Sequence, residues 1–323
     1  MRILVTGATG FVGRHLLPLL LARQNEIFGT YLQPDSSVFP KQVRLLSCDL
    51  RDADLVTQVI KDVRPARIYH LAALSSVRNS FQSVLDVYQA NFFGTLHLLD
   101  AVGALQPSSR ILLVGSGHCY GRVKRAQLPI TEDQPLAPLS PYGVSKAAAD
   151  LLGGQFFNNH NLHVIRVRPF NHTGPGQSPE FVCSDFARQF AAIALGLAPP
   201  VLHVGNLTSR RDFSDVRDVV RAYTLLMHKG KPGEIYNVCS GRAVSLQQVL
   251  NILGSFCPRK VTVHVVPARI RKAEEHVLFG SNRKLQKTTS WRPLYELKRT
   301  LYDLYQHWAT ILQPEVRNSG AAI

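Results

Sequence analysis

Three side chains in the middle of the chain have the types and spacing of a proton-transfer site. Tyr142 and Lys146 stand four positions apart after Pro141, so in a helix their side chains share one face. An ammonium group beside a phenol favours the phenolate, and we expect Lys146 to lower the pKa of Tyr142 toward neutrality. Ser116 ends a predicted strand, where its hydroxyl can polarise a substrate carbonyl or merely cap a loop.

A second Tyr-x-x-x-Lys match, Tyr120 with Lys124, falls in a predicted loop. No helix is expected there to align the two side chains, so we interpret this pair as a chance match.

The elements that must position these residues begin at the N-terminus. An apolar run of strand length, 2–6, is followed by the glycine turn Gly7–Gly13 and then by a helical apolar pattern. Gly7 permits a tight turn, Gly10 admits a diphosphate close to the backbone, and Gly13 lets helix and strand pack closely. A helix N-terminus supplies N–H donors to phosphates. With Ser116, Tyr142 and Lys146, this turn predicts a nicotinamide-dependent hydride-transfer site.

Short apolar runs and helical patterns alternate through the first half, which predicts an α/β fold with a doubly wound parallel (Rossmann) sheet. The expected strands are 2–6, 26–31, 43–47, 67–71, 110–116 and 162–168, with helices at 11–23, 52–63, 80–105 and 141–158. We assign residues 1–168 to a dinucleotide-binding domain, with returning segments near 205–240. Prolines and glycines then break up the pattern, and 169–323 is expected to be mainly a smaller, loop-rich substrate-binding domain.

Composition excludes several classes of protein. The 323 residues are 45% hydrophobic, with no apolar run of membrane-spanning length, and the first strand follows Met1 directly. Five scattered cysteines fit reduced thiols, so we expect a cytoplasmic protein with no disulfide framework. No Cys/His spacing predicts a metal site. The net charge of +15 suits an anionic ligand, but no aromatic residues interleave with basic runs, so specific nucleic-acid binding is not expected.

Motifs along nearly the whole chain resemble those of the extended short-chain dehydrogenases/reductases that act on nucleotide sugars. The matching stretches are Gly7–Gly13, His70-Leu-Ala-Ala73, Ser116, Tyr142-x-x-x-Lys146, Arg168-Pro-Phe-Asn-His-Thr-Gly-Pro-Gly-Gln177, Arg211-Asp-Phe-Ser-Asp-Val-Arg-Asp218, Tyr236-Asn-Val-Cys-Ser-Gly241 and Gly280-Ser-Asn282. Within that family they look most like the members that reduce the C4 ketone of GDP-4-keto-6-deoxy-D-mannose to GDP-D-rhamnose. The resemblance therefore implies a GDP-sugar substrate.

The resemblance also implies roles for individual residues. Ser116 would orient the ketone, Tyr142 would protonate its oxygen, and Lys146 would hold the nicotinamide ribose. Cofactor contacts are implied for Gly7, Thr9, Gly10, Phe11, Val12, Asp49, Leu50, Leu71, Ala72, Ala73, Tyr142 and Lys146. Substrate contacts are implied for Ser76, His118, Asn171, Phe181, Val182, Arg211, Arg271 and Glu274.

One position separates sister activities within the family. The similar 4,6-dehydratases carry a glutamate, their base at C5, two residues before the tyrosine that corresponds to Tyr120. Here that position is His118, so elimination loses its carboxylate, although a histidine can also act as a base. The alternatives that stay open are a dehydratase, a nucleotide-sugar 4-epimerase that retains NAD, and a non-catalytic NAD(P)-sensing protein.

The cofactor form and the assembly are less directly encoded. The second strand ends at Thr30-Tyr31-Leu32 without the acid that selects NAD, and Arg14 follows the glycine turn, so we expect NADPH with NADH possible. The family dimerises through two helices per subunit. We therefore expect a homodimer through the helices at 80–105 and 141–158.

Overall fold

A computed structural model describes residues 1–33, 39–270 and 277–319, with side chains as far as residue 313. The chain forms two compact units, neither of which is one continuous segment. Unit 1 is Met1–Phe170, Val219–Val238 and Ser281–Arg292, and unit 2 is Asn171–Asp218, Cys239–Gly280 and Pro293–Ile323. The return of Ser281–Arg292 to unit 1 is not anticipated by the sequence pattern.

Unit 1 is built on a seven-stranded sheet in the order β11-β6-β5-β4-β1-β2-β3, in which every pair is parallel. Its strands are β1 (Arg2–Thr6), β2 (Glu26–Tyr31), β3 (Val43–Ser47), β4 (Arg67–His70), β5 (Arg110–Val114), β6 (His163–Pro169) and β11 (Ile235–Val238). The predicted doubly wound α/β fold is confirmed.

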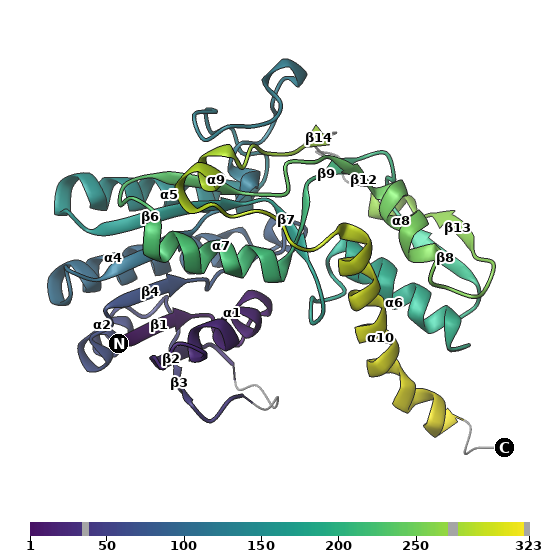
Figure 1. Cartoon of the computed structure of the whole chain (residues 1–323), viewed down its shortest axis with the longest axis horizontal. Helices are drawn as coiled ribbons and strands as arrows, with labels where there is room; N and C mark the ends of the chain where they lie inside the picture. Colours follow the sequence, from purple (N-terminus) through teal and green to yellow (C-terminus); the bar gives the residue numbers. More distant parts are fainter. Residues whose placement is uncertain (34–38, 271–276, 320–323) are drawn as a thin grey trace. The chain divides into compact units, whose positions relative to one another are not determined.

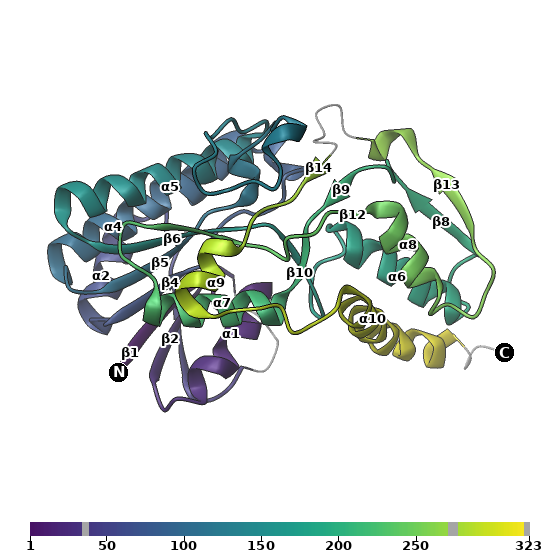
Figure 2. The ribbon, with the colours of Figure 1, turned by 45° about the horizontal axis from the view of Figure 1, so that its top comes forward.

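Helices cover both faces of this sheet (Figures 1 and 2). They are α1 (Phe11–Leu21), α2 (Ala53–Val63), α4 (Gly94–Leu105), α5 (Pro141–His160), α7 (Val216–Lys229) and α9 (Arg283–Thr289). On one face α2, α4 and α5 enclose a core in which Leu4 packs with Val56 and Leu98. On the other face lie α1 and α7 (Figure 2). Apolar residues on both sides bury the central strands and give their continuous hydrophobic runs.

The strand order reverses between β1 and β4. From β1 the chain proceeds to β2 and β3 on one side, whereas β4, β5 and β6 follow on the other. Thr6 and His70, the last residues of β1 and β4, are register partners at this switch point. In open α/β sheets the crevice beyond the carboxyl ends of two such strands is where ligands bind.

The helix expected at 80–105 is confirmed from Val84 to Leu105, but it begins four residues later than predicted and contains a π turn. The structure has a 3-10 turn η1 (Asn79–Phe81), a short helix α3 (Val84–Tyr88), a π-helical turn η2 (Gln89–Phe93) and α4. The wider π turn lies at Asn91, whose side chain makes contacts outside the helix. Further 3-10 turns are η3 (Gly117–Cys119), η4 (Arg125–Gln127) and η5 (Pro267–Arg269).

Unit 2 has its own core beneath three helices, α6 (Val182–Ala194), α8 (Leu246–Gly254) and α10 (Leu297–Ser319). Phe186 and Phe190 of α6 pack there with Leu253 of α8 and Leu301 of α10. Short strands pair around this core. They are β7 (Asn171–Thr173), β8 (Val201–Val204), β9 (Arg210–Arg211), β10 (Phe213–Asp215), β12 (Val244–Ser245), β13 (Thr262–Val265) and β14 (Val277–Leu278).

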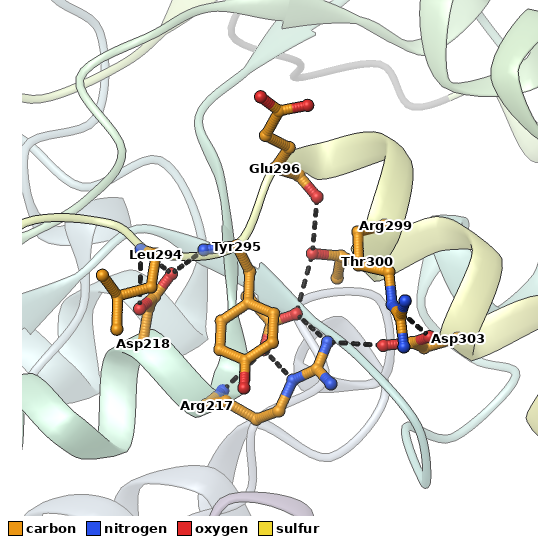
Figure 3. Close-up of polar contacts among 9 residues, drawn as sticks. Arg217, Asp218, Leu294, Tyr295, Glu296, Arg299, Thr300 and Asp303 are labelled. Carbon is orange, nitrogen blue, oxygen red and sulfur yellow. Dashed lines mark hydrogen bonds and ion pairs between the residues drawn. The ribbon is translucent and has the colours of Figure 1, made fainter.

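A polar cluster fixes the start of α10 within unit 2 (Figure 3). The Arg217 guanidinium donates to the buried Asp215 carboxylate from Nε at 2.8 Å and Nη2 at 2.6 Å. It also lies 3.8 Å from the Tyr295 ring centroid and pairs with Asp303 at 2.8 Å. Thr300 donates to the same Asp215 carboxylate at 2.7 Å. Because the Asp215 carboxylate is buried, loss of any of these partners would leave its charge incompletely compensated.

Candidate active site

The glycine turn has the geometry that its sequence predicts. Gly7 has a φ of +66°, which favours glycine, and α1 begins at Phe11 without a side-chain cap on its first N–H groups. A Cβ on Gly13 would lie 2.3 Å from the carbonyl oxygen of Ala8, so only glycine permits this close packing. Thr9, Phe11 and Val12 lie in or next to this turn, which supports their predicted place beside a diphosphate.

The loop after β4 packs directly against that turn. A Cβ on Gly7 would lie 2.9 Å from the backbone N and Cα of Ala72, so the two segments are in close contact. Leu71, Ala72 and Ala73 are half-buried at this edge of the sheet. The predicted cofactor residues of β1 and β4 therefore lie side by side at the switch point.

The predicted proton-transfer residues come together in unit 1. Ser140 caps α5 by accepting from the Gly143 N–H at 3.1 Å, which fixes the start of the helix two residues before Tyr142. Tyr142, Lys146 and Ser116 are all buried, and the Ser116 hydroxyl hydrogen-bonds the Tyr142 phenol. The predicted strand over 110–116 ends at Val114, and Ser116 instead caps η3 by accepting from the His118 N–H at 3.1 Å.

The expected lowering of the Tyr142 pKa is wrong. Burial raises the pKa of Tyr142 to about 12, against a smaller opposing effect of its hydrogen bond with Ser116. The Lys146 ammonium donates to the carbonyl oxygen of Val114 at 2.6 Å, and burial lowers the pKa of Lys146 to about 8. Sharing a helix face does not decide where a long amine points. The structure therefore holds a neutral phenol, the form that gives a proton to a developing alkoxide.

Asp49 and Leu50, two predicted cofactor contacts that follow β3, have different surroundings. The Asp49 carboxylate accepts from the Arg51 side chain at 2.6 to 3.0 Å, and this hydrogen bonding holds the pKa of Asp49 below its usual value. Leu50 is buried beneath Gly94, where a Cβ would lie 2.9 Å from the Leu50 Cβ. Arg51 is a partner of Asp49, a predicted cofactor contact, that the sequence analysis missed.

Of the two predicted substrate residues of unit 1, His118 lies in the 3-10 turn η3 and Ser76 lies in a loop. The His118 ring stands next to Tyr142, with ring centroids 6.1 Å apart. Ser76 accepts from the Asn79 N–H at 3.2 Å and so also fixes the start of η1. His118 is thus placed with the proton-transfer residues, whereas Ser76 has a local structural role as well.

The remaining substrate predictions fall in unit 2 or outside the described residues. Asn171 opens β7, Phe181 and Val182 start α6, and Arg211 is a buried residue of β9. The Arg211 guanidinium donates to the carbonyl oxygen of Arg210 at 3.0 Å. Arg271 and Glu274 lie outside the described residues.

The pair interpreted as a chance match has another role. Tyr120 is fully buried; its hydroxyl donates to Asn237 at 2.7 Å and accepts from Arg168 at 3.0 Å. Arg168 in turn donates to the two carboxylate oxygens of Asp150 of α5, at 2.7 and 3.1 Å. Lys124, by contrast, is exposed. This network anchors the helix that carries Tyr142 and Lys146 to β6.

Asn91 is a second residue that the sequence analysis missed. Its side-chain amide accepts from the Leu74 N–H at 2.8 Å and donates to the Leu74 carbonyl at 3.1 Å and to Ser145 Oγ at 3.0 Å. Ser145 donates to the carbonyl of Tyr142 at 2.8 Å. An amide inside an apolar helical stretch was the available signal, because buried amides need partners.

Within residues 1–33, 39–270 and 277–319, no group of three or more His, Cys, Asp or Glu side chains is arranged to hold a metal ion. In the same residues no helix has the length and apolar character needed to cross a membrane.

The parallel sheet, the glycine turn and the Ser116, Tyr142 and Lys146 set define a nicotinamide-dependent oxidoreductase of the extended short-chain dehydrogenase/reductase class. Over residues 4–304 the chain matches the family described as GDP-mannose 4,6 dehydratase. The chain belongs to this family.

Individual relatives match over nearly their full length. GDP-6-deoxy-D-mannose reductase of Pseudomonas aeruginosa is 35% identical, over 97% of this chain and 99% of the relative. The structure of RMD from Pseudomonas aeruginosa complexed with NADPH has a TM-score of 0.83 at 34% identity, covering 96% of this chain and 99% of its own. A putative epimerase from Burkholderia cenocepacia has a TM-score of 0.85 at 32% identity, covering 96% and 98%.

Proposed function

We propose that the protein reduces the C4 ketone of GDP-4-keto-6-deoxy-D-mannose with NADPH and forms GDP-D-rhamnose. The observation that carries this proposal is the buried Tyr142 of α5 beside Ser116, facing a segment after β5 that contains no carboxylate. The full-length similarity to a GDP-6-deoxy-D-mannose reductase supports the substrate.

The chain's own residues supply a proton and orient the ketone. The nicotinamide, when bound, supplies the hydride to C4 of the sugar. Ser116 hydrogen-bonds the ketone oxygen and orients it, and the neutral Tyr142 phenol donates its proton to that oxygen as negative charge develops. Lys146 binds the nicotinamide ribose from the same helix face, and the N–H groups at the start of α1 hold the cofactor diphosphate.

The loop after β5 favours reduction over dehydration. Elimination of water from the sugar needs a base at C5, and residues 115–124 contain no Asp or Glu. The acid nearest in the chain to Lys146, Asp150, is buried in its ion pair with Arg168. His118 stands beside Tyr142 and contacts the sugar in this proposal, with no need to act as a base.

Product analysis tests this assignment. Incubation with NADPH and GDP-4-keto-6-deoxy-D-mannose should consume the two in equal amounts and yield GDP-D-rhamnose. With GDP-mannose alone, no 4-keto-6-deoxy sugar should form. Formation of that sugar would identify a dehydratase, and NAD retained through purification together with C4 epimerisation of a nucleotide sugar would identify an epimerase.

Arg14 supports the choice of NADPH. It follows the glycine turn, its Nε donates to the carbonyl oxygen of Thr9 at 2.9 Å, and its guanidinium lies 4.7 Å from the Phe39 ring centroid. β2 ends at Tyr31 with no acidic residue to accept from a ribose 2′-hydroxyl. A guanidinium held by Thr9 and Phe39, next to a strand β2 that ends without a carboxylate, suits a 2′-phosphate, and NADH is the weaker alternative.

An exposed apolar surface supports a homodimer. It comprises Phe81, Leu85 and Phe93 of the α3 region together with Val144 and Leu151 of α5, and Leu85 and Leu151 are 75% and 61% exposed. α3 packs against α5, which joins the two groups. Side chains of this size gathered on two adjacent helices suit a second copy of the chain. We place the protein in the cytoplasm because none of its five cysteines is in a disulfide.

A further inference from the structure

A buried histidine links the ends of β1 and β4 at the switch point of the sheet. His70 is 1% exposed, and its Nδ1 lies 2.8 Å from Thr6 Oγ1 of β1. Its Nε2 lies 3.0 Å from Thr95 Oγ1 of α4. Both threonines are buried as well, so water does not complete these hydrogen bonds. The proposed mechanism does not use His70.

In the series of hydrogen bonds through Thr6, His70 and Thr95, each donor can be assigned because each threonine hydroxyl has one hydrogen. Thr95 lies 2.6 Å from the backbone carbonyl of Asn91, which can only accept, so its hydrogen is committed there. Thr95 must then accept from His70 Nε2. In a neutral imidazole Nδ1 is left as an acceptor, which the Thr6 hydroxyl fills. Thr6 itself accepts from the Ala72 N–H at 3.2 Å.

All the hydrogen bonds therefore run in one direction, from the Ala72 N–H through Thr6, His70 and Thr95 to the Asn91 carbonyl. A charged imidazolium would reverse the Thr6 bond and leave the Thr6 hydrogen without an acceptor. Burial opposes that charge too and lowers the pKa of His70 to about 3.

We call this series of hydrogen bonds, from Ala72 to Asn91, the relay. Each of its two ends lies in a segment that the proposed reaction needs. Ala72 belongs to the loop against the Gly7 turn, where a Cβ on Gly7 would already lie 2.9 Å from the Ala72 backbone. Asn91 holds Leu74 of the same loop and Ser145 of α5, which bonds the carbonyl of Tyr142. The relay thus sets the spacing between loop 71–74 and the start of α5, the helix that carries Tyr142.

We propose that His70, held as the neutral Nε2–H tautomer by Thr6 and Thr95, is a positioning residue for the nicotinamide cofactor. This role rests on the proposed function, because it assigns loop 71–74 to the cofactor. The tautomer itself follows from the hydrogen bonds alone, so the two parts can be tested separately.

The tautomer is tested by ¹⁵N NMR of the wild-type protein labelled at histidine. One of the 12 histidines should show a protonated Nε2 and an unprotonated Nδ1, with no titration from about pH 8 to about pH 5. The signal is assigned to His70 by its shift in Thr95→Ser, which retains the hydroxyl. A protonated Nδ1, or titration near neutral pH, would overturn the proposal.

The positioning role is tested by NADPH binding measured through cofactor fluorescence, which needs no sugar. Thr95→Val removes the acceptor of the His70 Nε2–H and should weaken NADPH binding about ten-fold or more, with a mixed His70 tautomer. Thr95→Ser should bind within about two-fold of wild type because its hydroxyl restores the relay.

Thr289→Val is the matched control, since Thr289 is also a buried threonine that donates to the carbonyl four residues earlier, Leu285. It should lower stability without weakening NADPH binding. Equal NADPH affinity in Thr95→Val and wild type would overturn the positioning role. Failure of wild type to bind any nicotinamide cofactor would instead refute the proposed function, and the NMR signal would still decide the tautomer.

Discussion

The Tyr142 phenol keeps its proton because burial raises its pKa and because Lys146 points at the carbonyl of Val114. Sequence spacing put phenol and amine on one helix face, which is confirmed, but it gave the wrong direction for the pKa. Burial and the aim of a flexible side chain are set by tertiary packing, which an i, i+4 pattern does not contain. A reductase benefits from this outcome, since the phenol must be protonated before hydride transfer.

Replacing Tyr142 with Phe should lower the rate of ketone reduction by about 100-fold or more, the usual contribution of a general acid. NADPH binding should stay within about two-fold, because the ring remains. Tyr223→Phe is the control. Tyr223 is equally buried, and its hydroxyl has no hydrogen-bond partner within the described residues. Full activity in Tyr142→Phe would refute the assigned role.

Cofactor choice should depend on the guanidinium of the half-buried Arg14. Arg14→Gln should raise the KM for NADPH about ten-fold and leave that for NADH nearly unchanged, because only NADPH carries the 2′-phosphate. Arg44→Gln serves as a control, since Arg44 also stacks on a phenylalanine, at 5.5 Å from the Phe28 ring centroid. Steady-state kinetics with both cofactors measures the ratio. An equal change for NADPH and NADH would contradict the assignment.

At the scale of elements, the local sequence was enough to predict β1, the glycine turn and α1. Each of them is short, and the glycines of the turn stand where a side chain would clash with the neighbouring backbone. The helix expected at 80–105 continues through a π turn, which we attribute to the hydrogen bonds of Asn91 with Leu74 and Ser145, neither of them in that helix. The short strands of unit 2 could not be predicted from the sequence either, because they depend on distant partners. For example, β9 pairs with β12 and β14, which lie far along the chain. Arg271 and Glu274 stay predictions.

The Arg217 cluster should dominate the stability of unit 2. Arg217→Met would leave the Asp215 carboxylate buried without its guanidinium, at a cost of about 3 kcal/mol of unfolding free energy. Arg299→Met is the control, because Arg299 pairs with Asp303 at 2.8 Å but is 67% exposed, so it should cost at most about 1 kcal/mol. Urea unfolding measures both variants. Equal losses would show that burial of Asp215 is not what matters.

At the scale of the whole molecule, the exposed apolar surface on α3 and α5 predicts the oligomeric state. Light scattering should give a mass twice the 35.9 kDa of one chain. Leu85→Glu or Leu151→Glu should shift the protein toward monomer, because each places a charge in an apolar interface. Leu294→Glu changes a leucine that is 69% exposed elsewhere and should leave the dimer intact. A monomeric wild type would rule out this surface as a dimer interface.

The interleaved course of the chain also governs the order in which the protein can fold during synthesis. β6 ends at Pro169, yet its outer neighbour β11 begins only at Ile235. While the ribosome makes the intervening residues, the nascent sheet carries an unpaired apolar edge that could join another chain. We therefore expect the nascent chain to be most prone to aggregation between those two points of translation.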